Sequence, residues 1–270
     1  MALPEPAPDR TCIVTGASSG IGVELAKQLA GRGLGVTLVA RREDRLKAIA
    51  DELAASTGVR AEVVAADLTD EAARAAIPAT LAERGLTVDV LVNNAGLSTT
   101  GPVASNDVAA ELRMIRTDVE AVVHLCSLVV PGMVERGRGA VLNVASTAAF
   151  QPLPGQAGYG GSKAFVLSYT RAMAQELHGT GVTATTLCPG PVETEFAEAA
   201  GFSEEEASGS LPKIMWVSAS DVAKAAVDGM DRGRPVVIPG MANRVGASLA
   251  HLTPRRVLLP ILARQHPALK

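Results

Sequence analysis

The chain has 270 residues and a net charge of −3; hydrophobic residues make up 47% of it and aromatic residues only 3%. The acidic balance, and the lack of aromatic residues interleaved with basic ones, argue against a nucleic-acid surface. Cys12, Cys126 and Cys188 are widely separated, so they predict buried apolar thiols rather than a disulfide framework. The four histidines are scattered and none has metal-ligand spacing. We therefore expect no metal, and a core of Ala, Val and Leu.

The first ten residues, MALPEPAPDR, lack the basic and then apolar pattern of a signal peptide. The longest apolar run, 119–134, is interrupted by Glu120, His124 and Pro131 and is expected to be too short to span a bilayer. The expected location is a reducing cytoplasm.

Short apolar runs alternate with helix-length segments along the chain. The runs that predict strands are 11–15, 36–40, 61–65, 88–92, 140–145, 183–187 and 236–238. The segments that predict helices are 21–32, 43–56, 71–84, 107–134, 159–178 and 219–232. This alternation predicts an α/β fold, with a doubly wound, mostly parallel sheet of about seven strands flanked by helices. Because no linker is present, we expect one domain over 1–240, with 241–270 as an extension packed on it.

The first predicted strand leads into the glycine-rich segment TGASSGIG. Gly16 permits a tight turn, Gly20 lets a phosphate approach the backbone, and Gly22 lets the helix pack on the sheet. The first turn of that helix offers N–H groups to a pyrophosphate. An ordinary Gly/Ser turn is the alternative, but the strand–turn–helix setting favours nucleotide binding. The candidate residues of this turn are Gly16, Ser18, Ser19, Gly20, Ile21 and Gly22.

Arg41 and Arg42 follow the second predicted strand directly. A carboxylate at this point would accept hydrogen bonds from the ribose of NAD, whereas arginine accommodates the 2′-phosphate of NADP. Glu43 comes only after both arginines. The alternative is that the arginines merely begin a solvated helix. The pair favours NADP(H) over NAD(H).

Polar residues also follow the third and fourth predicted strands. Asp67, next to Leu68, could accept from an adenine amino group or cap the next helix. After the fourth strand, the segment Asn93-Asn94-Ala95-Gly96 has small side chains, so its backbone could run past a ribose, with Asn94 along the cofactor. An ordinary Asn/Gly turn has the same composition.

The fifth predicted strand ends at Ser146, and Tyr159 and Lys163 lie one turn apart on the helix that follows. Residues four apart share a helix face. The lysine charge favours the phenolate and should bring the tyrosine pKa closer to working pH. Ser146 could hold a carbonyl or hydroxyl oxygen against the phenol. Tyr-x-x-x-Lys alone is weak evidence, because many helices carry it by chance.

These motifs, followed by Pro189-Gly190, occur in an order that resembles the short-chain dehydrogenase/reductase family over about residues 10–240. The resemblance implies a Rossmann-type domain that uses a nicotinamide cofactor. It makes Tyr159 the general acid/base, while Lys163 lowers its pKa and binds the nicotinamide ribose, and Ser146 orients the substrate. It implies that the cofactor contacts the glycine turn, Asp67 and Leu68, Asn94, Ala95 and Gly96, and Pro189, Gly190, Val192 and Thr194.

Asp118 departs from the family pattern, which usually has an asparagine at this place in the long helix. In the family this residue completes a catalytic tetrad and holds a water, largely through its backbone carbonyl. Aspartate keeps the carbonyl but loses the amide donor, and it brings a carboxylate near Lys163. A tolerated polar residue with little effect is the alternative.

The segment 191–217 is expected to form the substrate lid. Phe196, Phe202, Leu211 and Trp216 are candidates for its apolar walls, and Glu193 and Glu195 are interpreted as a solvated loop. The tail 241–270 has five Lys and Arg residues, no acidic residue and an apolar run. Because Pro254 and Pro260 interrupt it, packing on its own or a partner subunit is favoured over a membrane-surface contact.

The sequence thus predicts an NADP(H)-dependent oxidoreductase that interconverts a carbonyl and a secondary alcohol on an apolar small molecule. Epimerase or dehydratase chemistry on the same scaffold is one alternative, and a non-catalytic NADP(H)-binding sensor is another. The resemblance also implies a homodimer or homotetramer that pairs through helices 107–134 and 159–178.

Overall fold

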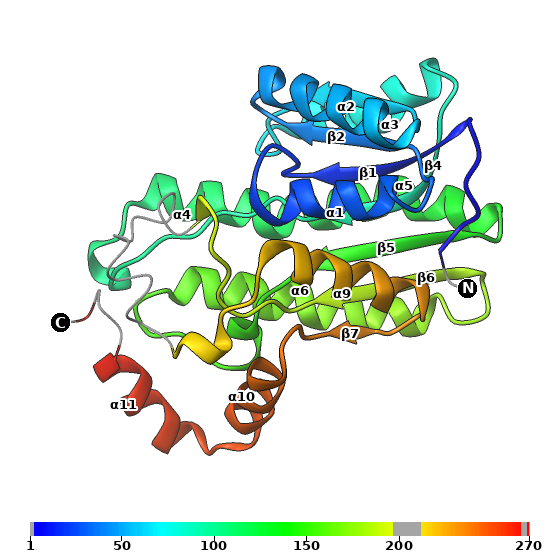
Figure 1. The fold of residues 1–270 in the computed structure, drawn as a ribbon. Helices are drawn as coiled ribbons and strands as arrows, with labels where there is room; N and C mark the ends of the chain where they lie inside the picture. Colours follow the sequence, from blue (N-terminus) through cyan, green and yellow to red (C-terminus); the bar gives the residue numbers. More distant parts are fainter. Residues whose placement is uncertain (1–2, 197–211, 266–268, 270) are drawn as a thin grey trace.

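The computed structural model describes residues 3–196, 212–265 and 269. Its seven strands form one parallel sheet in the order β3-β2-β1-β4-β5-β6-β7, so the predicted doubly wound sheet is confirmed (Figure 1). The strand order reverses between β1 and β4, and in such sheets ligands bind beside that point. The strands are β1 (Arg10–Thr15), β2 (Val36–Ala40), β3 (Ala61–Ala65), β4 (Thr87–Asn93), β5 (Gly139–Val144), β6 (Val182–Leu187) and β7 (Val236–Val237).

Helices cover both faces of the sheet, which explains why most residues of the strands are apolar. On β1, Val14 faces α1 (Gly20–Ala30), α2 (Glu43–Thr57) and α9 (Ala219–Asp231). Its neighbour Ile13 points the other way, as alternation along a strand requires, and packs with α3 (Glu71–Glu83), α5 (Ala121–Glu135) and α6 (Ala157–Glu176).

The long helix 108–135 consists of α4 (Val108–Ile115), a π-helical segment η2 (Arg116–Glu120) and α5. This helix is long and apolar enough to cross a membrane by length and composition, whereas the expectation concerned only the shorter run 119–134 inside it. Burial accounts for much of its apolarity, because α5 places Leu125 and Met133 in the core against the sheet. The π-helical segment buries Thr117 and Asp118, and such segments are frequent at functional sites.

The C-terminal part forms α10 (Met241–Leu252) and α11 (Arg255–Gln265), which extend from one end of the molecule (Figure 1). The inner face of α10 packs on the short helices η3 (Thr147–Phe150) and η4 (Lys213–Met215). Its outer face exposes Met241, Val245, Leu249 and Leu252. Packing on a partner subunit and contact with a membrane both stay predictions. A further short helix, η1 (Val103–Ser105), precedes α4.

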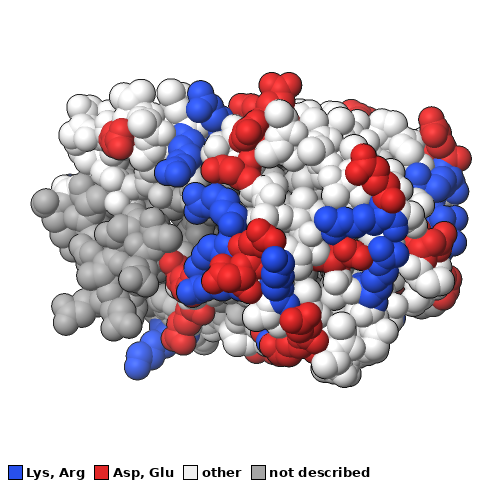
Figure 2. Space-filling view, turned by 90° about the horizontal axis from the view of Figure 1, so that it is seen from above, with Lys and Arg blue, Asp and Glu red and all other residues white. Residues whose placement is uncertain are grey.

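The surface carries charges of both signs. Figure 2 shows Lys and Arg interspersed with Asp and Glu on the face that it presents, with no broad field of one sign. Interspersed charges do not produce the strong single-sign potential that steers a polyanion to a protein.

Arg74 on α3 is fully buried and connects three elements. Its guanidinium donates to the Leu68 carbonyl at 2.7 Å and to Nδ1 of His124 at 3.1 Å, and it pairs with Glu120. His124 therefore has a structural partner on α5. Arg74 fixes the loop after β3, which lines the cavity described below, against the long helix.

We expect Arg74→Met to lower the free energy of unfolding by about 2 kcal/mol, because the buried Leu68 carbonyl loses its donor. Glu120 is half exposed and can turn to water, which limits the loss. Arg84→Met is the control: Arg84 is exposed and pairs with Glu62, and its loss should cost less than about 1 kcal/mol. Urea unfolding of both variants tests this, and equal losses would show that Arg74 has no special role.

Candidate active site

One large cavity opens at the carboxyl ends of β1, β2, β4, β5 and β6. Its volume is about 1250 Å³, above the roughly 300–1,000 Å³ of sites for drug-sized ligands. It runs from Arg41 and Asp67, past the glycine turn, to Ser146 and Tyr159 and then to Trp216. The cavity therefore has room for a dinucleotide and a second small molecule. Apart from Gly22 and Asp118, the predicted site residues line this cavity, and they come from seven separate segments of the chain.

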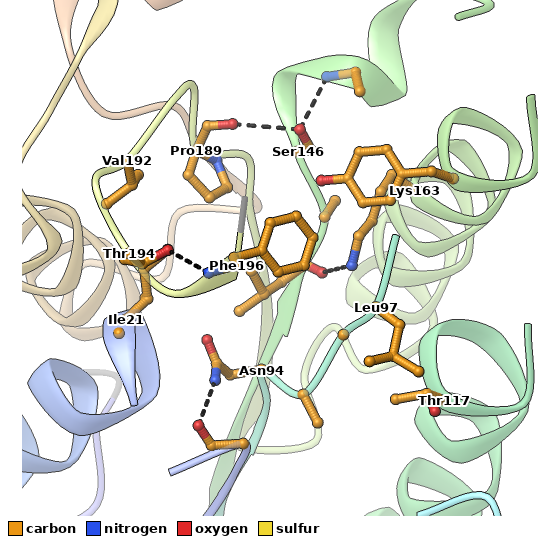
Figure 3. A pocket seen from close by; sticks show the side chains of 18 of the residues that line it. Ile21, Asn94, Leu97, Thr117, Ser146, Lys163, Pro189, Val192, Thr194 and Phe196 are labelled. Atoms are coloured by element: carbon orange, nitrogen blue, oxygen red, sulfur yellow. Dashed lines mark hydrogen bonds between the residues drawn. The ribbon is translucent and has the colours of Figure 1, made fainter. Parts of the chain in front are cut away.

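Ser146 caps η3, just beyond β5, with its hydroxyl accepting from the Ala148 N–H at 3.1 Å. The hydroxyl also lies 3.5 Å from the Pro189 carbonyl, an arrangement drawn in Figure 3. The phenol of Tyr159, which α6 carries, lies close enough for the Ser146 hydroxyl to act on its pKa. The serine and the phenol thus converge on one point in the cavity.

Lys163 lies one helical turn after Tyr159, with its Nζ 5.6 Å from the centre of the tyrosine ring. The ammonium is buried and donates to the Val144 carbonyl at 3.3 Å. Oδ2 of Asp118 lies 2.9 Å from Nζ, and Oδ1 accepts from the Leu97 N–H at 2.7 Å. The expected carboxylate beside Lys163 is therefore present, as a buried ion pair. It is positioned by the π-helical segment.

The environment moves the three titratable groups in one direction. Burial raises the pKa of Tyr159, while the Lys163 charge and the Ser146 hydrogen bond act to lower it and the Asp118 charge adds to the rise. Burial likewise raises the pKa of Asp118, against the opposing effect of Lys163. Burial acts to lower the pKa of Lys163, but Asp118 and Tyr159 outweigh it and the pKa is raised. Lys163 therefore keeps its charge.

The expectation that Lys163 would bring the Tyr159 pKa down overall was wrong for this state of the protein. The lysine acts in the predicted direction, but desolvation of the phenol dominates. The sequence indicated the neighbour and gave no measure of burial.

The glycine turn needs its glycines. Gly16 and Gly20 have φ of +65° and +57°, which side-chain-bearing residues rarely adopt, and a Cβ at Gly22 would lie 2.3 Å from the Gly16 carbonyl. Asn94 ties β4 to this turn, with its side-chain amide donating to the Thr15 carbonyl at 2.9 Å. The first turn of α1 has no acidic residue and borders the cavity, so its N–H groups suit a pyrophosphate. The residues present therefore fit a dinucleotide.

At the other end of the cavity, Asp67 accepts from the backbone and the hydroxyl of Thr69, at 2.9 and 2.8 Å. The Thr69 N–H lowers the pKa of Asp67. Asp70 caps α3 through the Ala72 N–H, which settles the capping alternative that the sequence left open for Asp67. Asp67 and Leu68 remain free to line the cavity beside Arg41.

Two residues here were not assigned to the site from the sequence. Arg45 lines the cavity and, like Arg42, pairs with Glu195. Glu195 is exposed, as the interpretation of a solvated loop expected, but it is also the ion-pair partner of two arginines, which that interpretation did not include. The signal for Arg45 was its place in the first turn of α2, three residues after Arg42, which is the N-cap of that helix. Nothing local predicted Glu195, which is about 150 residues away along the chain.

The loop after β6 crosses the cavity. Pro189, Gly190, Val192 and Thr194 all line it, and the ring of Phe196 lies 6.0 Å from that of Tyr159 (Figure 3). Trp216 lines the cavity as predicted. Phe202 and Leu211, and most of the predicted lid, lie outside the described residues. In the described part of the chain, no group of three His, Cys, Asp or Glu is placed to hold a metal ion.

The family model described as short chain dehydrogenase matches residues 10–205. This chain belongs to the short-chain dehydrogenase family. It is 38% identical, over 215 residues, to a sulfoacetaldehyde reductase of Chromohalobacter salexigens, with 78% of this chain and 84% of the relative covered. It is also 41% identical to a short chain dehydrogenase of Pseudocercospora fijiensis. That alignment covers 69% of this chain and 60% of the length of the relative.

Among solved structures, a short-chain dehydrogenase of Sphingobium yanoikuyae in complex with NADPH has 34% identity and a TM-score of 0.80. The alignment covers 93% of this chain and 95% of that one. Membership makes the chain an oxidoreductase of this family, with a Rossmann-type fold that binds a nicotinamide cofactor. The family pattern and the cavity geometry lead to the same residues.

Asp118→Asn tests the electrostatic arrangement. The change removes the carboxylate that acts to raise the pKa of Tyr159, while an amide oxygen can still accept from the Leu97 N–H. Provided that Lys163 stays charged, we expect the phenol to ionise at lower pH.

The chain has only two tyrosines, so ultraviolet titration in a Tyr169→Phe background reports on Tyr159 alone. A shift to higher pH would mean that Lys163 loses its charge without its partner, and it would contradict the arrangement described here.

Proposed function

We propose that this chain is an NADP(H)-dependent oxidoreductase that interconverts a carbonyl and a secondary alcohol. The observation that carries the proposal is the convergence of the Tyr159 phenol and the Ser146 hydroxyl above the buried Lys163 ammonium, at one end of a cavity suited to a dinucleotide. Such a set donates and removes a proton at an oxygen atom, as reduction of a carbonyl or oxidation of an alcohol requires.

The chain's own residues divide the work. The Ser146 hydroxyl donates to the substrate oxygen and holds it against the phenol. Tyr159 gives its proton to that oxygen in reduction and accepts it in oxidation. Lys163 stabilises the phenolate that remains, and Asp118 keeps Lys163 charged and in place. The nicotinamide cofactor, when bound, supplies or accepts the hydride.

Two observations support NADP(H) over NAD(H). Arginines, and no acidic residue, directly follow β2, where the 2′-phosphate of NADP is accommodated. Arg42 is held toward the glycine turn by the hydroxyls of Ser18 and Ser19, at 3.0 Å each. The Sphingobium yanoikuyae relative was solved with NADPH, and so was an actinorhodin polyketide ketoreductase of 33% identity.

The substrate end of the cavity favours an apolar compound. Its lining is mostly hydrophobic, with Leu97, Leu153, Phe196, Met215, Trp216 and Leu262. Gln151 and Gln156 add polar groups to the same lining. A structural relative from Comamonas testosteroni, 28% identical with a TM-score of 0.75, is described as a bulky-bulky ketone specific alcohol dehydrogenase. We therefore propose an apolar ketone or its alcohol as the substrate.

Assembly and location are proposals as well. We propose a homodimer or homotetramer through α5 and α6, which expose Leu128, Val134 and Phe165. We also propose a reducing cytoplasm, with which the three free, buried cysteines are compatible.

Tyr159→Phe should lower kcat by about 10²–10⁴-fold, because the proton donor is lost. The dissociation constant for NADPH should change little, since the arginines and the glycine turn remain. Tyr169→Phe is the matched control: Tyr169 is on the same helix but stacks on Phe165, outside the cavity.

Steady-state NADPH oxidation with a panel of ketones and aldehydes, including long-chain and polycyclic ones, measures both variants. Normal turnover by Tyr159→Phe would refute the proposed acid–base role. If the wild type binds NADPH but does not oxidise it in net turnover, the result would favour epimerase or dehydratase chemistry, or a non-catalytic NADP(H)-binding sensor.

Arg41→Ala with Arg42→Ala tests the cofactor preference. Losing charge-assisted hydrogen bonds to the 2′-phosphate should weaken NADPH binding by about tenfold or more. The affinity for NADH, which lacks that phosphate, should stay nearly constant. Fluorescence titration with each cofactor gives both values, and equal weakening of the two would rule out a phosphate-binding role.

A further inference from the structure

Arg42 and Arg45 both form ion pairs with the carboxylate of Glu195. Arg42 Nη1 donates to one carboxylate oxygen of Glu195 at 3.0 Å, and Arg45 Nη1 donates to both oxygens, at 2.9 and 3.3 Å. The two arginines also hold the pKa of Glu195 below its usual range, so the group is an anion at neutral pH. One carboxylate thus joins two guanidinium groups at the end of the cavity where the adenosine would bind.

The same guanidinium groups are the ones that a 2′-phosphate needs. Nη2 of Arg42 is engaged with the hydroxyls of Ser18 and Ser19. Nη1 of Arg42 and Nη1 of Arg45 are the donors that Glu195 occupies. Arginine binds carboxylate and phosphate through the same fork of N–H groups, so the carboxylate is a chemical stand-in for the phosphate.

We propose that Glu195 is an internal competitor for the 2′-phosphate of NADP(H), and that Arg45 is a third arginine of that phosphate site. This inference rests on the proposed use of NADP(H). The incoming phosphate displaces the carboxylate from both arginines, whereas NAD(H) leaves the ion pairs intact. Glu195 therefore reduces the preference of the enzyme for NADP(H) relative to what its arginines alone would give.

Replacing the Glu195 carboxylate by a phosphate costs little free energy, because Glu195 is exposed. Its side chain is 52% exposed, and those of Arg42 and Arg45 are 40% and 47% exposed. Ion pairs at such positions are weak, because water and salt screen them. A phosphate carries more charge and more acceptor oxygens than a carboxylate, so it should win the competition. The displaced carboxylate can then be hydrated where it is.

Glu195→Gln removes the competing charge and keeps the size of the side chain. Two weak ion pairs are involved, so we expect NADPH to bind roughly three- to tenfold more tightly, with little change for NADH. Adenosine 2′,5′-bisphosphate, which has no nicotinamide, should show the same gain, and this readout does not depend on activity. Glu193→Gln is the control, because it removes a carboxylate two residues away on the same loop.

Arg45→Ala completes the test. It should weaken NADPH and adenosine 2′,5′-bisphosphate even in the Glu195→Gln background, because the phosphate loses a ligand. Unchanged or weaker NADPH binding by Glu195→Gln would overturn the competition, and an equal gain in Glu193→Gln would reduce it to a general charge effect.

The cofactor preference is tested separately by Arg42→Ala. If the competition by Glu195 fails but Arg42→Ala still weakens NADPH and not NADH, the proposed cofactor preference stands. Equal weakening of NADPH and NADH by Arg42→Ala would instead reject the preference itself.

Discussion

The ammonium of Lys163 is a buried charge, and the surrounding site compensates for it. An isolated charge in a protein interior costs several kcal/mol or more, so it needs partners with good geometry. Asp118 provides a carboxylate at 2.9 Å, the Val144 carbonyl accepts at 3.3 Å, and the Tyr159 ring lies alongside. Three elements, β5, α6 and the π-helical segment, meet at this one atom. The requirement to satisfy Lys163 therefore also fixes the position of the phenol.

The groups that compensate the Lys163 charge also affect the pKa of Tyr159. A desolvated phenol resists ionisation, and Asp118 adds to that resistance, whereas Lys163 and Ser146 oppose it. Their balance places Tyr159 on the protonated side, as a proton donor to a carbonyl requires. An asparagine at position 118 has only one acceptor oxygen for the two donors that the carboxylate accepts from, the Leu97 N–H and the Lys163 ammonium. The aspartate instead gives the lysine a permanent partner, and this distinguishes the site from the family's usual pattern.

At the end of the cavity that holds Arg42 and Arg45, the charges are exposed to solvent, unlike the buried charge of Lys163. The ion pairs there are weak, so they can exchange partners. Arg42 is held by two serine hydroxyls of the glycine turn, and Glu195 reaches it from the loop that carries Phe196. Through Glu195 that loop pairs with the arginine cluster, and through Phe196 it packs near the ring of Tyr159. A rigid charged centre for chemistry and an adaptable charged end for binding thus share one cavity.

The sequence by itself determined the order of strands and helices, because apolar runs and glycine turns are local signals. It also indicated Tyr159, Lys163 and Ser146, through helix spacing, a strand end and an order of motifs that resembles the family. Only the tertiary structure decided the net direction of the Tyr159 pKa, the partners of Arg74 and the ion pairs of Glu195. Each of these depends on burial, or on contacts between residues far apart in the chain, such as Glu195 and Arg45. No local pattern carries that information, because folding creates those distances.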